Sequence, residues 1–328
     1  MKDVATLAGV SLTTVSRVVN EAPDVAPELA ARVHSAIRML GYRRDLTAST
    51  LRRADRLSRT VGLLLEDVAN PFFSTLHRSV EDVARARSVL VFAGSSDEDS
   101  ARERELVESL AARGVDGIII APTDGDQAYL QRDRELGLEI VFVDRPPRFV
   151  DADSVISDNA AGARRGVEHL IAAGHRRIAF LGDRPEVHTA AERLRGYREG
   201  IAAPGLEEIV VTGLLDSGAA RTATLELLSR PDPPTAVFSA QNLLTIGAVR
   251  ALHTLGLQNT VAHVGFDDVA LADALDPPVT VVAQDPVALG RHAAELLFSR
   301  LDGYRGPSRH VVVPVPLLVR GSGELPPA

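Results

Sequence analysis

The 328 residues include 45% hydrophobic and 24% charged residues, a composition that fits a globular protein of two or three domains and excludes disordered, collagen-like and coiled-coil chains. Cysteine is absent and Lys2 is the only lysine, which excludes disulfides, thiolate nucleophiles, zinc fingers and a P-loop or Schiff-base lysine in the body. The net charge of −8 argues against nucleic-acid binding, but residues 1–60 hold ten basic and six acidic groups, so a basic head precedes an acidic body.

The first twenty residues, MKDVATLAGVSLTTVSRVVN, have the spacing of a helix-turn-helix. Gly9 suits a turn position with positive φ, and Ser11 is a natural N-cap for the second helix. Val15 and Val18 supply the apolar contacts that hold the second helix across the first. A third helix is predicted between Pro27 and Gly41, and no strand pattern occurs in the head.

Four side chains of the predicted second helix point outward, where a recognition helix meets base edges. They are Leu12, Thr13, Ser16 and Arg17. The arginine can pair bidentately with guanine, the threonine can form a hydrogen bond, and the leucine can contact a thymine methyl group. The alternative interpretation is an ordinary helical hairpin whose arginine is solvated.

From residue 61 onward, short apolar runs alternate with amphipathic segments of helical period. The predicted strands, each expected to be buried on both faces, are 61–66, 89–94, 117–122, 140–144, 177–182, 209–213, 235–240 and 261–268. The predicted helices are 73–88, 101–113, 160–173, 190–200, 219–229 and 244–255. This alternation predicts parallel, doubly wound sheets. The number of units favours two similar subdomains with a ligand between them, at the C-terminal ends of the strands.

Ten phrases, spread in order along the chain, carry a family resemblance. They are DVATLAGVSLTTVSRVVN, LGYRRDLTASTLR, NPFFSTL, RGVDGIIIAP, VDRP, DNAAGA, HLIAAGHRRIAFLG, RLRGYREG, GFDD and DPPVTVVAQDP. On these phrases the chain resembles the lac-repressor (LacI/GalR) family of bacterial transcription regulators over essentially its whole length. The resemblance implies an α/β fold, with a helix-turn-helix head and a periplasmic-binding-protein-like body of two doubly wound parallel-sheet subdomains.

The resemblance also implies how the chain is divided. The expected parts are a DNA-binding head at 1–45, a hinge helix and linker at 46–59, an N-terminal subdomain of 60–156 plus 286–313, and a C-terminal subdomain of 157–285 plus 314–328. The crossovers between the subdomains are expected near Ile156, Ala283 and Val313. Family members bind near-palindromic operators as homodimers, which matches the geometry of a two-fold dimer.

In the hinge of the family, a leucine enters the central minor-groove step of the operator, and Leu51 stands at that position. Arg52 and the arginines that follow it are expected to attract phosphates; the alternative is a solvated linker. Two residues depart from the family, because Arg44 stands where proline is usual and Ser49 where arginine is usual. The family's preference for a particular sequence at the operator centre is therefore not transferred to this chain.

Members of the family that bind small ligands use an arginine and an aspartate whose positions are occupied here by Arg193, in RLRGY, and Asp267, in GFDD. A guanidinium and a carboxylate facing each other suit vicinal hydroxyl groups. Phe72 and Phe73 are expected to cover the apolar face of the ligand, although one of them is a candidate for the core. Asp144, in VDRP, is a third polar candidate, with a loop carboxylate or helix cap as the alternative.

The largest departure from the family lies in AQNLLTIGA, where asparagine followed by aspartate is usual and Gln241 and Asn242 stand instead. Gln241 remains a candidate amide contact for the effector. Loss of the carboxylate removes a charged acceptor, so the ligand is expected to have fewer donors or a different epimeric pattern. Asp158 and Asn159 are assigned mainly to capping the helix that follows.

Other functional classes find little support in the sequence. No metal or nucleophile motif occurs among the scattered histidines and serines, so we expect no enzyme activity and no cofactor. No apolar run reaches about 18 residues and no signal peptide is recognisable, so we expect a cytoplasmic regulator without a membrane partner rather than an exported solute-binding protein. The expected partners are double-stranded operator DNA and a small effector, either a sugar or, as the alternative, a purine or another polar metabolite.

Overall fold

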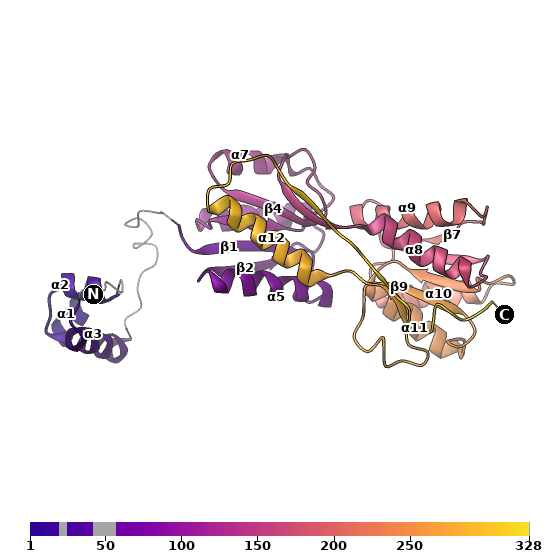
Figure 1. The fold of residues 1–328 in the computed structure, drawn as a ribbon, viewed down its shortest axis with the longest axis horizontal. Helices are drawn as coiled ribbons and strands as arrows, with labels where there is room; N and C mark the ends of the chain where they lie inside the picture. The colour runs from indigo at the N-terminus through magenta and orange to yellow at the C-terminus, as the bar shows by residue number, and fades with distance from the viewer. Residues whose placement is uncertain (20–24, 42–56, 328) are drawn as a thin grey trace. The chain divides into compact units, whose positions relative to one another are not determined.

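The computed structural model describes residues 1–19, 25–41 and 57–327. Two units, Met1–Ser58 and Arg59–Ala328, are distinguished by their internal contacts, and each is described by itself below (Figure 1). Among the described residues, no helix is both long enough and apolar enough to span a bilayer.

The first unit contains three helices, α1 (Lys2–Ala8), α2 (Leu12–Val19) and α3 (Pro27–Leu40). Gly9 ends α1 in the left-handed conformation, with φ of 61°, which costs glycine little because it has no Cβ. The Ser11 hydroxyl oxygen accepts a hydrogen bond from the Thr14 amide at 3.0 Å and so caps α2. Val15 and Val18 are buried in the small core of this unit. The predicted helix-turn-helix is therefore present.

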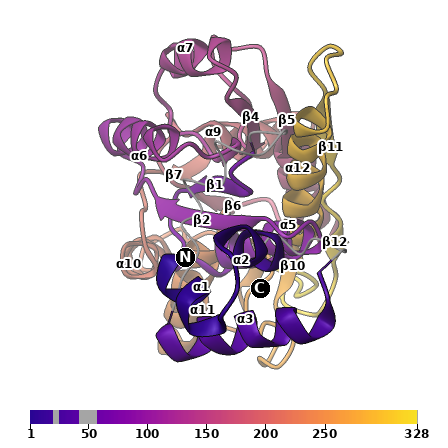
Figure 2. The same ribbon diagram turned by 90° about the vertical axis from the view of Figure 1, so that its left-hand side faces the viewer.

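The first subdomain of the second unit is a six-stranded sheet. In spatial order its strands are β11 (His310–Val313), β5 (Asp153–Ser157), β4 (Glu139–Asp144), β3 (Gly117–Ile120), β1 (Thr60–Leu65) and β2 (Leu90–Ser95), all paired in parallel. Alternate residues of the strands face opposite sides. Val61, Leu63 and Leu65 pack toward α5 (Pro71–Ala86) and α12 (Pro286–Leu301), whereas Leu64 packs toward α6 (Ser100–Ala112) on the other face. Figure 2 shows α6 and α12 on either side of the sheet.

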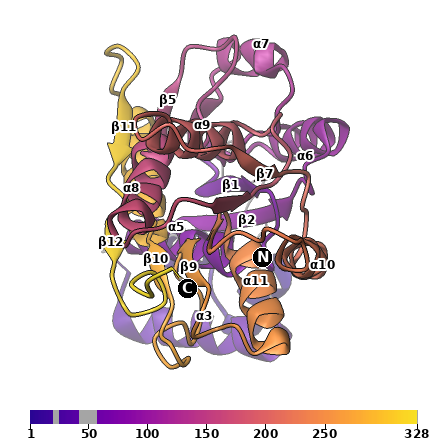
Figure 3. The same ribbon diagram turned by 90° about the vertical axis from the view of Figure 1, so that its right-hand side faces the viewer.

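The second subdomain repeats this plan. Its strands are β12 (Leu317–Leu318), β10 (Thr280–Val282), β9 (Ala262–Phe266), β8 (Ala236–Ser239), β6 (Ile178–Leu181) and β7 (Ile209–Val211), in spatial order, with only β12 antiparallel. Helices α8 (Asn159–Ala172) and α9 (His188–Ala202) cover one face of the sheet. Helices α10 (Ser217–Leu228) and α11 (Asn242–Leu255) cover the other (Figure 3). The chain passes between the subdomains after β5, after β10 and after β11.

Two of the predicted strands are not buried on both faces, so that expectation was wrong for them. β2 and β7 each pair with a single neighbour at the edge of a sheet. In β2, Leu90 is 60% exposed and Phe92 is 47% exposed. The sequence predicted neither the four short strands β5, β10, β11 and β12, nor helix α12, nor the short 3-10 helix η1 (Gln127–Tyr129) and helix α7 (Leu130–Glu135).

Candidate ligand pocket and nucleic-acid interface

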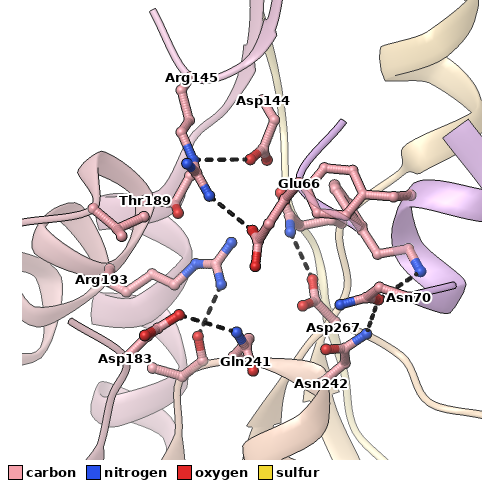
Figure 4. Close-up of a pocket in the computed structure, with 16 residues that line it drawn as sticks. Glu66, Asn70, Asp144, Arg145, Asp183, Thr189, Arg193, Gln241, Asn242 and Asp267 are labelled. Atoms are coloured by element: carbon pink, nitrogen blue, oxygen red, sulfur yellow. Dashed lines mark hydrogen bonds and ion pairs between the residues drawn. The ribbon is translucent and has the colours of Figure 1, made fainter. Parts of the chain in front are cut away.

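A pocket lies where the C-terminal strand ends of the two subdomains meet, and it contains about 450 Å³ of empty space, open solvent included. The six effector-site residues proposed from the sequence all line it (Figure 4). They are Phe72, Phe73, Asp144, Arg193, Gln241 and Asp267. The other ionisable side chains that line it are Glu66, Arg145 and Asp183. Residues far apart in the chain are thus brought to one cavity.

Asp144 and Asp267 occupy equivalent places in the two subdomains. Asp144 ends β4 and Asp267 follows β9, and these strands hold the same position in the two sheet orders. Both aspartates have a left-handed backbone, with φ of 68° and 72°, a conformation that aspartate tolerates better than most residues. The two carboxylates, both buried, therefore enter the pocket from opposite subdomains (Figure 4).

Arg193 is fixed in the pocket by its neighbours. Its side chain is buried, its Nε atom donates to Asn159 Oδ1 at 2.7 Å, and its Nη1 atom donates to the Ala240 carbonyl at 2.8 Å. The guanidinium carbon lies 4.1 Å from the centre of the Phe266 ring, a cation–π contact. The sequence assigned Asn159 mainly to helix capping, but its side chain holds Arg193; Asp158 provides the cap by accepting from the Ala161 amide.

Arg145 joins several carboxylates at the side of the pocket formed by the first subdomain. Its Nη2 atom donates to Glu66 Oε2 at 2.8 Å and also forms an ion pair with Glu98, while its Nε atom lies 3.6 Å from Asp144 Oδ2. Burial raises the pKa of Asp144, and the guanidiniums of Arg145 and Arg193 oppose this shift. Burial likewise raises the pKa of Glu66, again against Arg145. The sequence did not single out Arg145, Glu66 or Asp183.

The two phenylalanines have different surroundings. Phe73 is buried in the core of the first subdomain, whereas Phe72 is only partly buried and packs against that core. Their rings meet edge to face with centres 5.0 Å apart. Phe72 is therefore the better placed of the two to cover a ligand, and Phe73 packs against it from the side of the core.

The predicted DNA-contacting residues of the head all lie on α2. Leu12, Thr13 and Arg17 are exposed and Ser16 is half-buried. The predicted hinge contacts Leu51 and Arg52, like the departures at Arg44 and Ser49, lie outside the described residues.

Residues 1–45 match the family model of bacterial regulatory proteins, lacI family, and residues 167–323 match the periplasmic binding protein-like domain. Over 334 residues, the chain is 35% identical to the HTH-type transcriptional regulator CelR of Thermobifida fusca, covering 98% of this chain and 97% of the relative. The chain belongs to the lacI family of bacterial regulatory proteins. This lacI-family chain is also 33% identical to the ribose operon repressor of Escherichia coli strain K12 over 309 residues, 92% of each protein.

Solved structures agree with this family assignment. The lac repressor dimer bound to operator and the anti-inducer ONPF superimposes with a TM-score of 0.84 at 27% identity, covering 98% of each chain. A complex of the transcriptional regulator CelR with cellobiose has a TM-score of 0.72 at 32% identity, also covering 98% of each. The predicted family and the predicted fold class are confirmed.

Asn242, one of the departures of this lacI-family chain, spans the cleft between the subdomains. Its Nδ2 atom donates to Asn70 Oδ1 at 2.7 Å. The same Asn70 oxygen caps α5 by accepting from the Phe72 amide at 3.0 Å, so Asn70 can only act as the acceptor. Gln241, by contrast, donates to Asp183 within the second subdomain at 3.3 Å. Asn242 therefore serves as a cross-cleft donor (Figure 4).

The substitution Asn242→Asp is expected to weaken the contact across the cleft by about 1–3 kcal/mol. A carboxylate cannot donate to Asn70 Oδ1, and the two oxygens repel each other. Small-angle X-ray scattering of the ligand-free lacI-family protein measures the effect as a larger radius of gyration. Asn70→Asp is the matched control, because aspartate still caps α5 and still accepts from Asn242. Equal expansion in both variants, or in neither, contradicts the cross-cleft role.

Proposed function

We propose that the protein is a sequence-specific transcriptional repressor that binds a near-palindromic operator as a homodimer and is controlled by a sugar bound in the pocket. One observation carries this proposal. Six residues nominated as effector contacts, from both subdomains, line one cavity in a chain that also has a helix-turn-helix head. A ligand that touches both subdomains favours one cleft arrangement over others, and this differential affinity is what an allosteric effector requires.

Sugar is favoured by the chemistry of the pocket. Arg193 offers donors, and Asp144 and Asp267 offer acceptors from opposite sides, which suits hydroxyl groups that both donate and accept. The partly buried Phe72 ring offers an apolar surface for the carbon-bound face of a sugar. Relatives of the chain include a CelR complex with cellobiose and a ribose operon repressor.

The dimer and the site of action complete the proposal. The edge strand β2 exposes Leu90 and Phe92, and apolar side chains exposed together on one edge strand suit a protein–protein contact. We place such a homodimer on DNA in the bacterial cytoplasm, acting by differential binding and without catalysis, as expected of relatives that are transcriptional regulators.

The sugar-sensor function is tested in two steps. A thermal-shift screen of free sugars and nucleobases should give a hit among the sugars, since a ligand at 100 times its Kd adds about 2.7 kcal/mol of stability. The hit should then change operator affinity, and operator DNA should change affinity for the hit by the same factor. A hit that leaves operator affinity unchanged at saturation is not the effector. Hits confined to nucleobases would replace the sugar by a purine.

Replacing Arg17 by alanine is expected to weaken binding to the specific operator by about 1–3 kcal/mol, because a bidentate contact to guanine is lost. Titration of labelled operator and of random duplex, at one salt concentration, measures the change. Affinity for the effector should stay as it was. Equal weakening on operator and random DNA would show that Arg17 contacts only phosphate.

A further inference from the structure

Carboxyl groups outnumber guanidiniums around the pocket. Four carboxyl groups line it, those of Glu66, Asp144, Asp183 and Asp267, against the two guanidiniums of Arg145 and Arg193. Glu98 adds a fifth carboxyl group, in contact with Arg145. The pocket therefore offers several carboxyl acceptors even though Asn242 brings no carboxylate.

The guanidiniums are already engaged. Arg145 donates to Glu66 and to the Pro122 carbonyl and forms an ion pair with Glu98, so its charge is neutralised within the protein. Arg193 donates two hydrogen bonds within the protein, to Asn159 Oδ1 and to the Ala240 carbonyl. Among the residues that the structure describes, none accepts a hydrogen bond from Arg193 Nη2 or from the buried Arg145 Nε, so each guanidinium keeps one donor group for a ligand.

Acceptors are more numerous than donors among the unsatisfied groups of the described pocket residues, where Arg145 Nε is an unsatisfied buried donor. No described residue donates a hydrogen bond to the carboxylate of Asp144, which is 3% exposed and whose closest cation lies 3.6 Å away. Gln241 Oε1 and Gln284 Oε1 are buried and also lack a donor within the described part of the chain. Asp267 receives one hydrogen bond, from Gln284 at 2.6 Å. Buried acceptors without donors are costly unless a ligand supplies the donors.

We infer that the pocket admits donor-rich ligands without a negative charge, free sugars above all, and rejects their phosphate esters, with Asp144 as the main excluding residue. The inference rests on the proposed function, which it narrows. Hydroxyl groups of a ligand can donate hydrogen bonds to the unpaired carboxylate and amide oxygens. A phosphate group brings only further acceptors and places like charges together in a poorly hydrated site, where their repulsion is strong.

The test compares matched pairs on the full-length protein by isothermal titration. The pairs are ribose with ribose 5-phosphate, glucose with glucose 6-phosphate, and adenosine with its 5′-monophosphate. Whichever free compound binds, we expect its phosphate ester to bind about 100-fold more weakly. A difference of tenfold or more supports the inference, and a smaller or reversed difference overturns it while leaving the sensor function intact. If only adenosine binds, the sugar assignment fails. The comparison of adenosine with its 5′-monophosphate then tests only whether the pocket rejects the charged ester. If nothing binds, the sensor function fails and the inference with it.

The role of Asp144 is tested by Asp144→Asn, which keeps the size of the side chain and tolerates the left-handed backbone. The ratio of affinities between the free compound and its ester should fall at least tenfold, as expected when one charge of the barrier is removed. Glu207→Gln, which removes an exposed carboxylate outside the pocket, should leave the ratio unchanged. Asp144→Ser provides a second variant of the same residue if Asp144→Asn does not fold. An unchanged ratio in the folded pocket variant overturns the assignment.

Discussion

Replacing Arg193 by methionine is expected to weaken effector binding by about 100-fold or more, because a charge-assisted donor to the ligand is lost. Methionine fills much of the same volume and packs well against the Phe266 ring. The change also leaves Asn159 Oδ1 and the Ala240 carbonyl without their donor, so the free energy of unfolding should fall by about 1–3 kcal/mol for each oxygen that stays buried and unpaired. Isothermal titration with the identified effector, on protein shown to be folded by circular dichroism, measures the loss.

Arg195→Met is the matched control, two residues along the same helix. Arg195 is exposed and forms ion pairs with Glu192 and Glu199 on the surface of α9. Such pairs contribute little to stability, so both effector affinity and stability should change little. Similar losses of affinity in both variants would show that α9 as a whole, and not the guanidinium of Arg193, determines binding.

Gly196→Ala is expected to destabilise the second subdomain by about 1–3 kcal/mol through overpacking. Gly196 lies where α9 touches α8, and a Cβ atom there would stand 2.1 Å from the carbonyl oxygen of Ala160. Backbone cannot yield as a flexible side chain does, so the two helices must separate. Because Arg193 precedes Gly196 by one turn and reaches Asn159 at the start of α8, effector affinity should fall as well.

Urea denaturation followed by circular dichroism measures the loss of stability. Gly94→Ala, in strand β2, is the control, because its Cβ would meet no atom closer than 3.4 Å, an ordinary contact distance. A denaturation midpoint for Gly196→Ala equal to that of the control would contradict the close approach of α8 and α9. The glycine of the RLRGY motif thus has a packing role that supports its arginine.

Much of the fold followed from hydrophobic pattern alone. Long apolar runs such as 61–66 and 235–240 coincide with the central strands β1 and β8, where burial on both faces selects branched side chains. Shorter strands escaped prediction. β5, with the sequence DSVIS, is mostly polar, and β10 and β12 have three and two residues, too few to establish a period. Nor does an apolar run reveal whether its strand lies at an edge, which is why β2 and β7 were misjudged.

The pocket was predicted less completely than the fold. The family motifs nominated residues one at a time, and the structure places those of the body around one cavity. Glu66, Arg145 and Asp183 were not predicted, because spacing along the chain does not tell which strand ends meet. A signal was nevertheless present: an acid follows the apolar runs VGLLL and IAFLG at the C-terminal ends of β1 and β6. In parallel sheets that is where ligands bind.

Because Asp144 and Asp267 occupy equivalent places in the two subdomains, a ligand must contact both subdomains to satisfy both carboxylates. Each subdomain contributes one carboxylate from the same position of its sheet, so a ligand contacts both carboxylates only when the two subdomains face each other. A molecule that donates to one carboxylate alone binds without linking the two subdomains. Such a molecule should therefore change the equilibrium between cleft arrangements only a little. We therefore expect binding and regulation to be separable, with effector activity restricted to compounds that contact both acids at once.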